Sequence, residues 1–273
     1  MGVLRVAHER WTEDQTKRAL FLYFQMPFGR LHQHAPEIIA LAAELGRTPS
    51  SIAMKLSNFA SLDPGIIASG RKGLAGASAL DRAIFARFYG NWDSLVNELP
   101  DQHSIPRTLL PVSSLREVPQ PFAGFAGPSE AERLVSTRRG QSFFRQAVMA
   151  NFEERCCITG IADLRLLNAS HIKPWQSDEA NRHNPANGFA LSATFDRAFD
   201  RGLVTINPDL AVRVSNLLLQ SASDRTRNYF KPYDGKRIRS PTRFMPDPAL
   251  LAWHNESVFL VSEIDPLRLN PGR

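Results

Sequence analysis

With 273 residues, 43% of them hydrophobic, the chain can hold two modest domains, and its formal net charge of +6 favours a polyanionic partner. The two cysteines are adjacent, at Cys156 and Cys157, which excludes a disulfide framework, and no apolar run approaches the roughly 18 residues needed to span a bilayer. We therefore expect a soluble, cytoplasmic protein without a membrane partner.

Residues 1–98 predict a helical domain. Thr12 with Gln15 is a capping-box pattern in front of an apolar stretch, and Pro27 ends that helix. A second helix is bracketed by Pro36 and Gly46, because proline suits the first position of a helix and glycine suits the position after its end. The segment therefore predicts short helices that follow one another closely.

A third helix is predicted directly after Thr48, with Ile52, Leu56 and Phe59 on its core face. Two helices joined by a tight glycine turn resemble a helix-turn-helix, whose second helix enters the major groove of DNA. A plain helical bundle is the alternative. Under the first interpretation, the DNA-reading residues on the outer face of the third helix are Ser50, Ser51, Lys55 and Asn58.

Residues 99–129 predict a proline-rich linker. This stretch shows little periodicity and contains Pro100, Pro106, Pro111, Pro119, Pro121 and Pro128. A second domain follows over residues 130–273. At its start, Arg138, Arg139 and Arg145 lie on or before a predicted helix, and we expect them to contact DNA phosphates because guanidinium groups bind phosphate bidentately.

The most informative stretch runs from residue 168 to residue 202. His171 lies near the end of a mostly apolar run, residues 164–172, which predicts a strand. Asn187 lies sixteen residues further on and precedes a second apolar run at residues 189–191. Past the following helix, residues 203–206 and 211–214 predict a hairpin, and residues 248–259 predict a closing helix.

Two carboxylates share one face of the helix that follows the second strand. Asp196 and Asp200 are spaced i, i+4, behind a serine and a threonine that can cap the helix. Oxygen ligands suit Mg²⁺ or Mn²⁺ better than zinc, while His171 can take a proton from water. Alternatively, the two carboxylates form a solvated helix face paired with Arg197 and Arg201.

These residues resemble the HNH endonucleases, which have a ββα-metal fold and leave a 5′-phosphate and a 3′-hydroxyl. The resemblance makes His171 the general base that activates water. It makes Asn187 the asparagine that braces the loop and orients this histidine. Asp196 takes the place of the final histidine of the family name, and Asp200 matches a second metal ligand one helical turn further on.

One position departs from the family pattern. The residue before the base is often an aspartate or histidine that also binds the metal, but here it is Ser170, a weak ligand. The cation is then expected to rely on the two aspartates, water and the scissile phosphate. The wider segment, residues 130–214, is similar to the branch of HNH proteins found in bacterial restriction systems.

The sequence therefore predicts an α+β chain with a helical, helix-turn-helix-like domain, a proline-rich linker and a C-terminal HNH nuclease domain. The expected function is metal-dependent cleavage of double-stranded DNA by a restriction-type homodimer, with Lys173, Arg197 and Arg201 as further DNA contacts. Two alternatives stay open: a DNA-binding regulator whose nuclease module is degenerate, and a nonspecific or RNA-directed nuclease.

Overall fold

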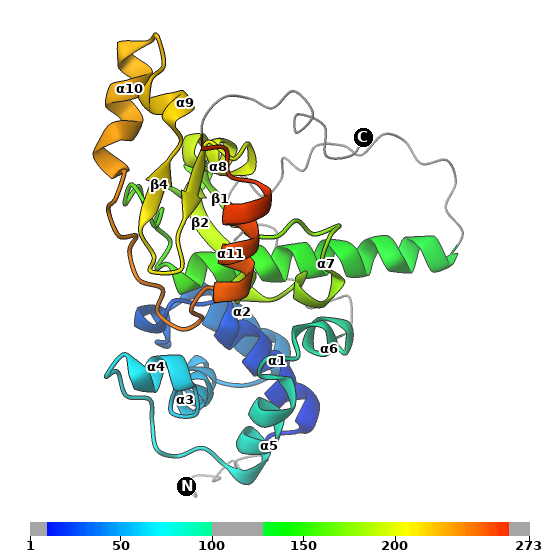
Figure 1. Cartoon of the computed structure of the whole chain (residues 1–273). Helices are drawn as coiled ribbons and strands as arrows, with labels where there is room; N and C mark the ends of the chain where they lie inside the picture. The colour runs from blue at the N-terminus through cyan, green and yellow to red at the C-terminus, as the bar shows by residue number, and fades with distance from the viewer. Residues whose placement is uncertain (1–9, 100–127, 262–273) are drawn as a thin grey trace, which may run out of the picture. The chain divides into compact units, whose positions relative to one another are not determined.

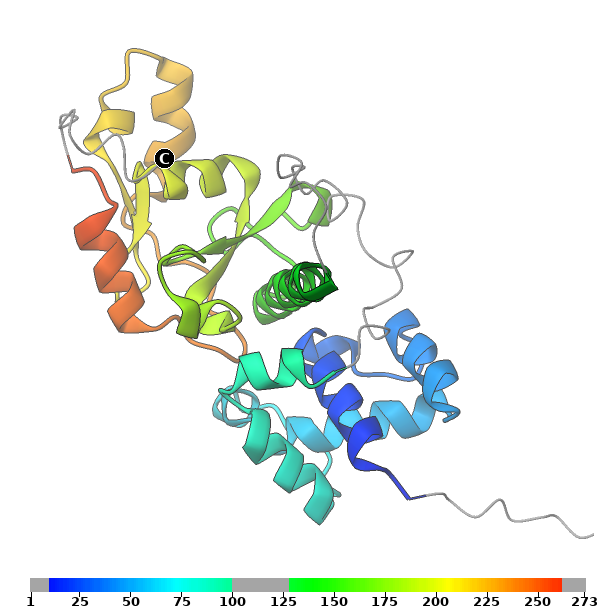
Figure 2. The same ribbon diagram turned by 90° about the vertical axis from the view of Figure 1, so that its right-hand side faces the viewer.

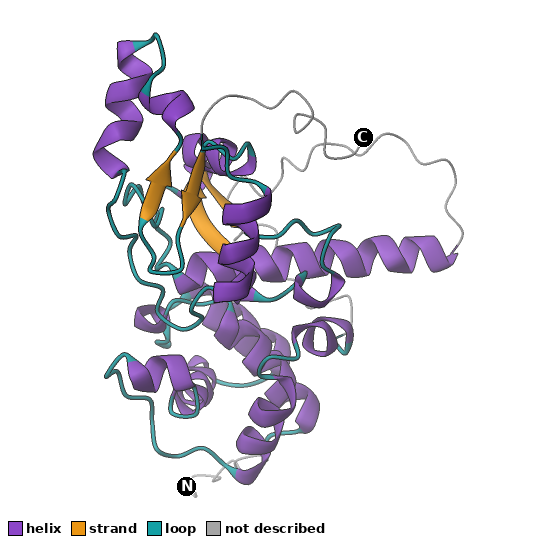
Figure 3. Ribbon diagram, in the orientation of Figure 1, coloured by secondary structure: helices purple, strands orange, loops and turns teal. Residues whose placement is uncertain are grey.

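The computed structural model describes residues 10–99 and 128–261. The chain divides into two compact units, residues 1–109 and 110–273, and every strand of the described part lies in the second unit (Figure 3). Helices together with small strands make the observed class α+β. The predicted linker falls almost wholly on residues 100–127, which lie outside the described residues. Within the part that is described, no helix is both long and apolar enough to cross a membrane.

The first unit is helical throughout its described length, apart from turns. Its α-helices are α1 (Glu13–Phe24), α2 (Pro36–Leu45), α3 (Pro49–Ala60), α4 (Pro64–Ala68), α5 (Ala79–Phe88) and α6 (Trp92–Asn97). A 3₁₀ turn, Phe28–Arg30, separates the first two helices. Sequence reasoning did not identify the last three helices.

Local hydrogen bonds explain where the predicted helices begin and end. Thr12 and Gln15 form the expected capping box at the start of α1. Gly46 ends α2 with φ +63°, a conformation that glycine adopts without strain. Thr48 then caps α3 by accepting a hydrogen bond from the backbone of Ser51. The connection between α2 and α3 is therefore as tight as the sequence predicted.

The second unit is built on a long helix and two hairpins (Figure 1). Its elements are α7 (Pro128–Asn151), β1 (Leu167–His171), β2 (Gly188–Ser192), α8 (Ala193–Asp200), β3 (Val204–Ile206), β4 (Val212–Val214), α9 (Asn216–Leu219), α10 (Asp224–Phe230) and α11 (Pro248–Ser257). Figure 2 looks along α7 and shows the β1–β2 hairpin lying across it. Both α7 and α8 pack against this hairpin, and α11 packs against β3.

The first hairpin sets the register of the site. Strands β1 and β2 are antiparallel, and His171 pairs with Gly188. A Cβ atom at Gly188 would lie 2.6 Å from Phe144 Cζ and 2.6 Å from Val148 Cγ2, so the absence of a side chain lets the hairpin approach α7. The core beneath it is apolar and aromatic, and both hairpins and the surrounding helices contribute to it, with Phe189 from β2 and Phe195 from α8.

The strand expected over residues 164–172 is shorter than predicted. Residues Leu164–Leu166 form a 3₁₀ turn, because the Asp163 side chain accepts a hydrogen bond from the backbone of Arg165 and holds the chain out of the sheet. The strand does end at His171. The predicted hairpin and closing helix are present as β3, β4 and α11.

Candidate active site

His171 is held between aromatic rings at the end of β1. Its imidazole stacks on Phe144 of α7, with ring centroids 3.7 Å apart and an angle of 7° between the planes. Trp175 meets the same imidazole edge-on, at 5.8 Å and 88°. A ring held by two neighbours loses much of its rotational freedom, so these contacts fix the direction of its nitrogens.

The hydrogen bond of His171 identifies its protonated nitrogen. Nε2 lies 3.1 Å from the carbonyl oxygen of Arg182. A carbonyl oxygen only accepts hydrogen bonds, so in the neutral ring Nε2 carries the proton and donates a hydrogen bond to this oxygen. The lone pair of the neutral imidazole is then on Nδ1, which becomes the atom able to take a proton from water.

The environment keeps this imidazole neutral. Burial lowers the pKa of His171 to about 4. The hydrogen bond to the carbonyl of Arg182 acts to raise this pKa, and the nearby His183 acts to lower it further. His183 comes close because Gly140 of α7 has no side chain: a Cβ atom there would lie 1.9 Å from His183 Nε2. At neutral pH His171 is therefore in the proton-accepting form that a general base requires.

Asn187 braces the loop between His171 and the second strand. Its side chain is completely buried. Its Oδ1 accepts the backbone N–H of Lys173 at 2.9 Å, and its Nδ2 donates to the carbonyls of Lys173 at 3.1 Å and Asn181 at 3.2 Å. Both ends of the amide are thus used to hold the chain that follows His171.

The two carboxylates predicted on one helical face lie in α8. Asp196 is half-buried, and its Oδ2 accepts a hydrogen bond of 2.6 Å from Asn168 Nδ2. Asp200 is more exposed, yet loss of hydration and the charge of Asp196 raise its pKa to about 6, against the lowering effect of Arg197 and Arg201. Loss of hydration is the larger cause of this rise, and the charge of Asp196 adds to it.

The predicted metal ligands Asp196, Asp200 and Ser170 offer oxygen atoms, which suit a hard divalent cation that keeps part of its water shell. Ser170 lies on the same face of β1 as Asn168, because side chains alternate along a strand. Its hydroxyl is buried and finds no hydrogen-bond partner among the described residues. The described chain holds no cluster of three or more histidine, cysteine, aspartate or glutamate residues. Two carboxylates and a hydroxyl nevertheless suit Mg²⁺, which commonly uses one or two carboxylates beside waters and phosphate. When bound, such a cation would stabilise charge on the leaving oxygen.

Two residues predicted to contact phosphate also have partners within the protein. Arg145 is half-buried, and its Nη2 donates to the carbonyls of Leu167 at 2.9 Å and Leu164 at 3.4 Å. Lys173 Nζ lies 3.4 Å from Asp178 Oδ2 in an ion pair. These partners could not be predicted from the sequence, because each depends on how the β1 region folds against its neighbours.

The other predicted DNA contacts of the second unit fall into three groups. Arg197 and Arg201 are exposed on α8, beside the carboxylates. Arg139 is half-buried on α7. The side chain of Arg138 lies outside the described residues. A direct role for any of these four in DNA binding stays a prediction.

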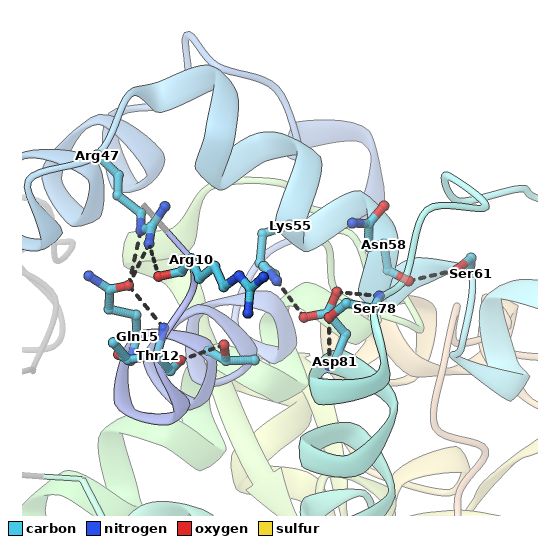
Figure 4. A network of polar contacts seen from close by, with 10 residues as sticks. Arg10, Thr12, Gln15, Arg47, Lys55, Asn58, Ser61, Ser78 and Asp81 are labelled. Atoms are coloured by element: carbon cyan, nitrogen blue, oxygen red, sulfur yellow. Dashed lines mark hydrogen bonds and ion pairs between the residues drawn. The ribbon is translucent and has the colours of Figure 1, made fainter. Parts of the chain in front are cut away.

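In the first unit, the prediction that Lys55 is available on the outer face of α3 is wrong. Lys55 is 5% exposed and its Nζ forms an ion pair with Asp81, as Figure 4 shows. Asp81 is itself completely buried at the start of α5. A lysine in this position neutralises a buried carboxylate, so it serves the fold. Of the other predicted residues, Ser50 is exposed, while Ser51 and Asn58 are half-buried.

A family model described as HNH endonuclease matches residues 156–207. This segment is an HNH endonuclease domain. It spans both strands of the first hairpin, helix α8 and strand β3, and so includes His171, Asn187, Asp196 and Asp200. A search of curated proteins finds none that matches the chain.

Several residues that shape the HNH site escaped the sequence analysis. Phe144 lies outside the matched segment, on α7, and no local pattern connects it with His171. Arg182 contributes only a backbone carbonyl, which any residue type provides. Asn168 carried one detectable signal, since it lies two residues before Ser170 and therefore shares its strand face.

Proposed function

We propose that this chain is a metal-dependent endonuclease that cleaves double-stranded DNA as part of a restriction-type defence system. The observation that carries the proposal is the geometry of His171, which stacks on Phe144 and directs Nε2 to the carbonyl of Arg182, in the same small domain as the two carboxylates of α8. Such a domain has a base for the attacking water and oxygen donors for Mg²⁺ or Mn²⁺.

The chemistry follows from the roles of these side chains. Nδ1 of His171 takes a proton from water, the resulting hydroxide attacks the scissile phosphorus, and the bond between phosphorus and the 3′ oxygen breaks. The 3′ oxygen leaves and takes up a proton from solvent water, so the products are a 5′-phosphate and a 3′-hydroxyl. Asn187 keeps the loop behind His171 in place, so the base does not drift from its position. Asp196 and Asp200 would hold the cation, which would also contact the phosphate.

Cleavage of a supercoiled plasmid tests the proposal. We expect the purified protein to nick the plasmid in Mg²⁺ or Mn²⁺ and to be inactive in a chelator. His171→Ala is expected to lower the rate by about 10²–10⁴-fold, the usual contribution of a positioned base. His32→Ala is the matched control, because His32 is exposed and lies in the first unit. Cutting in the chelator, or at the wild-type rate without His171, would contradict the mechanism.

Two other outcomes identify the alternative functions. A protein that shifts DNA in a gel but never nicks it would be a DNA-binding regulator, and the weak ligand Ser170 is the feature that favours this reading. Efficient competition by RNA would indicate an RNA-directed or nonspecific nuclease. Digestion of modified and unmodified genomic DNA, with the ends sequenced, would show whether base modification directs the enzyme.

We propose that the enzyme acts as a homodimer on DNA. A single ββα site holds one base, so it cuts one strand in each engagement, and a double-strand break needs two sites or two visits. Two-fold symmetry would favour a palindromic or paired target. Sedimentation of the complex with DNA measures this, and a strictly monomeric complex that makes concerted double-strand breaks would contradict it.

We further propose that α3 reads DNA bases through polar residues that are exposed or half-buried on its outer face. With Lys55 committed to Asp81, the remaining candidates are Ser50, Ser51 and Asn58. Asn58→Ala is expected to change which sequences are cut, since a base contact contributes about 1–3 kcal/mol of discrimination. Sequencing of cut ends from a randomised library measures this, and an unchanged preference would make the region a structural bundle.

A further inference from the structure

Asn168 makes the shortest polar contact of the candidate metal ligand Asp196. Its Nδ2 donates to Asp196 Oδ2 at 2.6 Å, linking β1 to α8 across 28 positions of sequence. Both residues are half-buried. Asp200, one helical turn further on, accepts no hydrogen bond from any described side chain, so the two carboxylates are held very differently.

The strand end that carries Asn168 is itself anchored to α7. Arg145 donates to the carbonyl of the preceding residue, Leu167, at 2.9 Å. Burial lowers the pKa of Arg145, and the nearby charge of Asp196 opposes that effect, so the guanidinium lies within the field of the same carboxylate. Three elements, α7, β1 and α8, therefore meet around Asp196.

We propose that Asn168 is the positioning residue of Asp196 and prepares it to bind the divalent cation. The inference rests on the proposed function. Asn168 engages Oδ2, which fixes the rotation of the carboxylate and leaves Oδ1 free for the metal. A neutral amide does this without cancelling the negative charge that attracts the cation, whereas a lysine or arginine donor would cancel part of it.

Binding of Mn²⁺ to the DNA-free protein, measured by calorimetry or by the Mn²⁺ electron paramagnetic resonance signal, tests the proposal without relying on activity. Asn168→Leu keeps the branching of the side chain at Cγ and removes the donor, and Asn168→Ala is a second variant in case the larger leucine packs poorly. We expect either change to weaken Mn²⁺ binding by about 10–100-fold, as loss of a hydrogen bond to a metal ligand commonly does.

Asn255→Leu is the matched control. Asn255 is also half-buried, but it donates to the carbonyls of Leu251 at 2.8 Å and Ile206 at 3.0 Å and not to an aspartate of α8. We expect this variant to melt at a lower temperature and to bind Mn²⁺ as the wild type does. The control separates a general loss of stability from a specific loss of metal affinity.

Each outcome supports or overturns the role of Asn168. Weaker Mn²⁺ binding in a variant that still unfolds cooperatively supports it. Unchanged binding overturns it, because Asn168 would then be merely structural, and tighter binding also overturns it, because the amide would be obstructing the ligand. If the wild type binds Mn²⁺ and cuts DNA while the variants bind normally, only this inference fails. If the wild type neither binds Mn²⁺ nor cuts DNA, the proposed function fails as well.

Discussion

Lowering the pH should affect the two titratable groups of the HNH site, His171 and Asp200, in different ways. Burial lowers the pKa of His171 to about 4, so the imidazole stays neutral well below the usual range. At about pH 5.5, a histidine with the ordinary pKa of about 6.5 is only about 9% neutral, whereas one with a pKa of about 4 is about 97% neutral. At saturating metal, an enzyme that uses His171 as its base should therefore keep nearly its full rate at this pH, about tenfold more than ordinary titration would allow.

The effect of Asp200 on the rate should depend on the metal concentration. The pKa of Asp200 is raised to about 6 in the absence of metal, so below that pH protons compete with the cation for its carboxylate. At limiting Mn²⁺ we expect the rate to fall as the pH drops through about 6. At saturating Mn²⁺ the cation keeps Asp200 ionised, and the same fall should disappear.

The assay is single-turnover nicking of a plasmid between pH 5 and pH 8, at limiting and at saturating Mn²⁺. Nuclear magnetic resonance of histidine Cε1 gives the pKa of His171 directly, with the resonance assigned as the one that His171→Ala lacks. An acid limb near pH 6.5 at saturating metal, together with a resonance that titrates there, would refute the argument that burial keeps the base neutral.

Three further predictions concern metal and stability. Asp196→Ala and Asp200→Ala should each raise the Mg²⁺ concentration needed for half-maximal cleavage, because each removes a hard oxygen donor; an unchanged requirement would exclude both as ligands. Lys55→Ala should destabilise the first unit by about 3–5 kcal/mol in thermal unfolding, since it leaves Asp81 buried without its counter-charge, and a shift confined to cleavage specificity would contradict the structural role. Burial lowers the pKa of His254 to about 4, so the folded state resists protonation of this imidazole. The stability that neutral His254 contributes is fully present above pH 6.5 and is lost as the pH falls towards 4. At pH 5 the free energy of unfolding should be lower by about 2 kcal/mol. Urea unfolding at pH 7 and pH 5 measures this loss, which should shrink in His254→Leu.

Features encoded within a few residues were predictable from the sequence. The capping boxes and glycine stops are local hydrogen-bond patterns, so Thr12 and Gly46 fixed the limits of α1 and α2 before any packing was considered. The order and spacing predicted His171 at the end of a strand, Asn187 just before a second strand and Asp196 on a helix, and these elements formed where expected. The exception was the turn after Asp163, where a side-chain hydrogen bond prevailed over strand propensity.

Contacts between distant segments were decided by the tertiary structure alone. The sequence predicts Lys55 to be a surface lysine. Its partner Asp81 lies 26 positions further along the chain, on α5, and only the tertiary structure brings the two side chains together. The sequence of Asn168 to Gly202 predicts a general base and ligands for a metal ion. It does not predict which nitrogen of His171 carries the proton, because that depends on the carbonyl of Arg182. Periodicity and spacing report which face a residue occupies, whereas protonation, burial and hydrogen-bond partners depend on which other face packs against it.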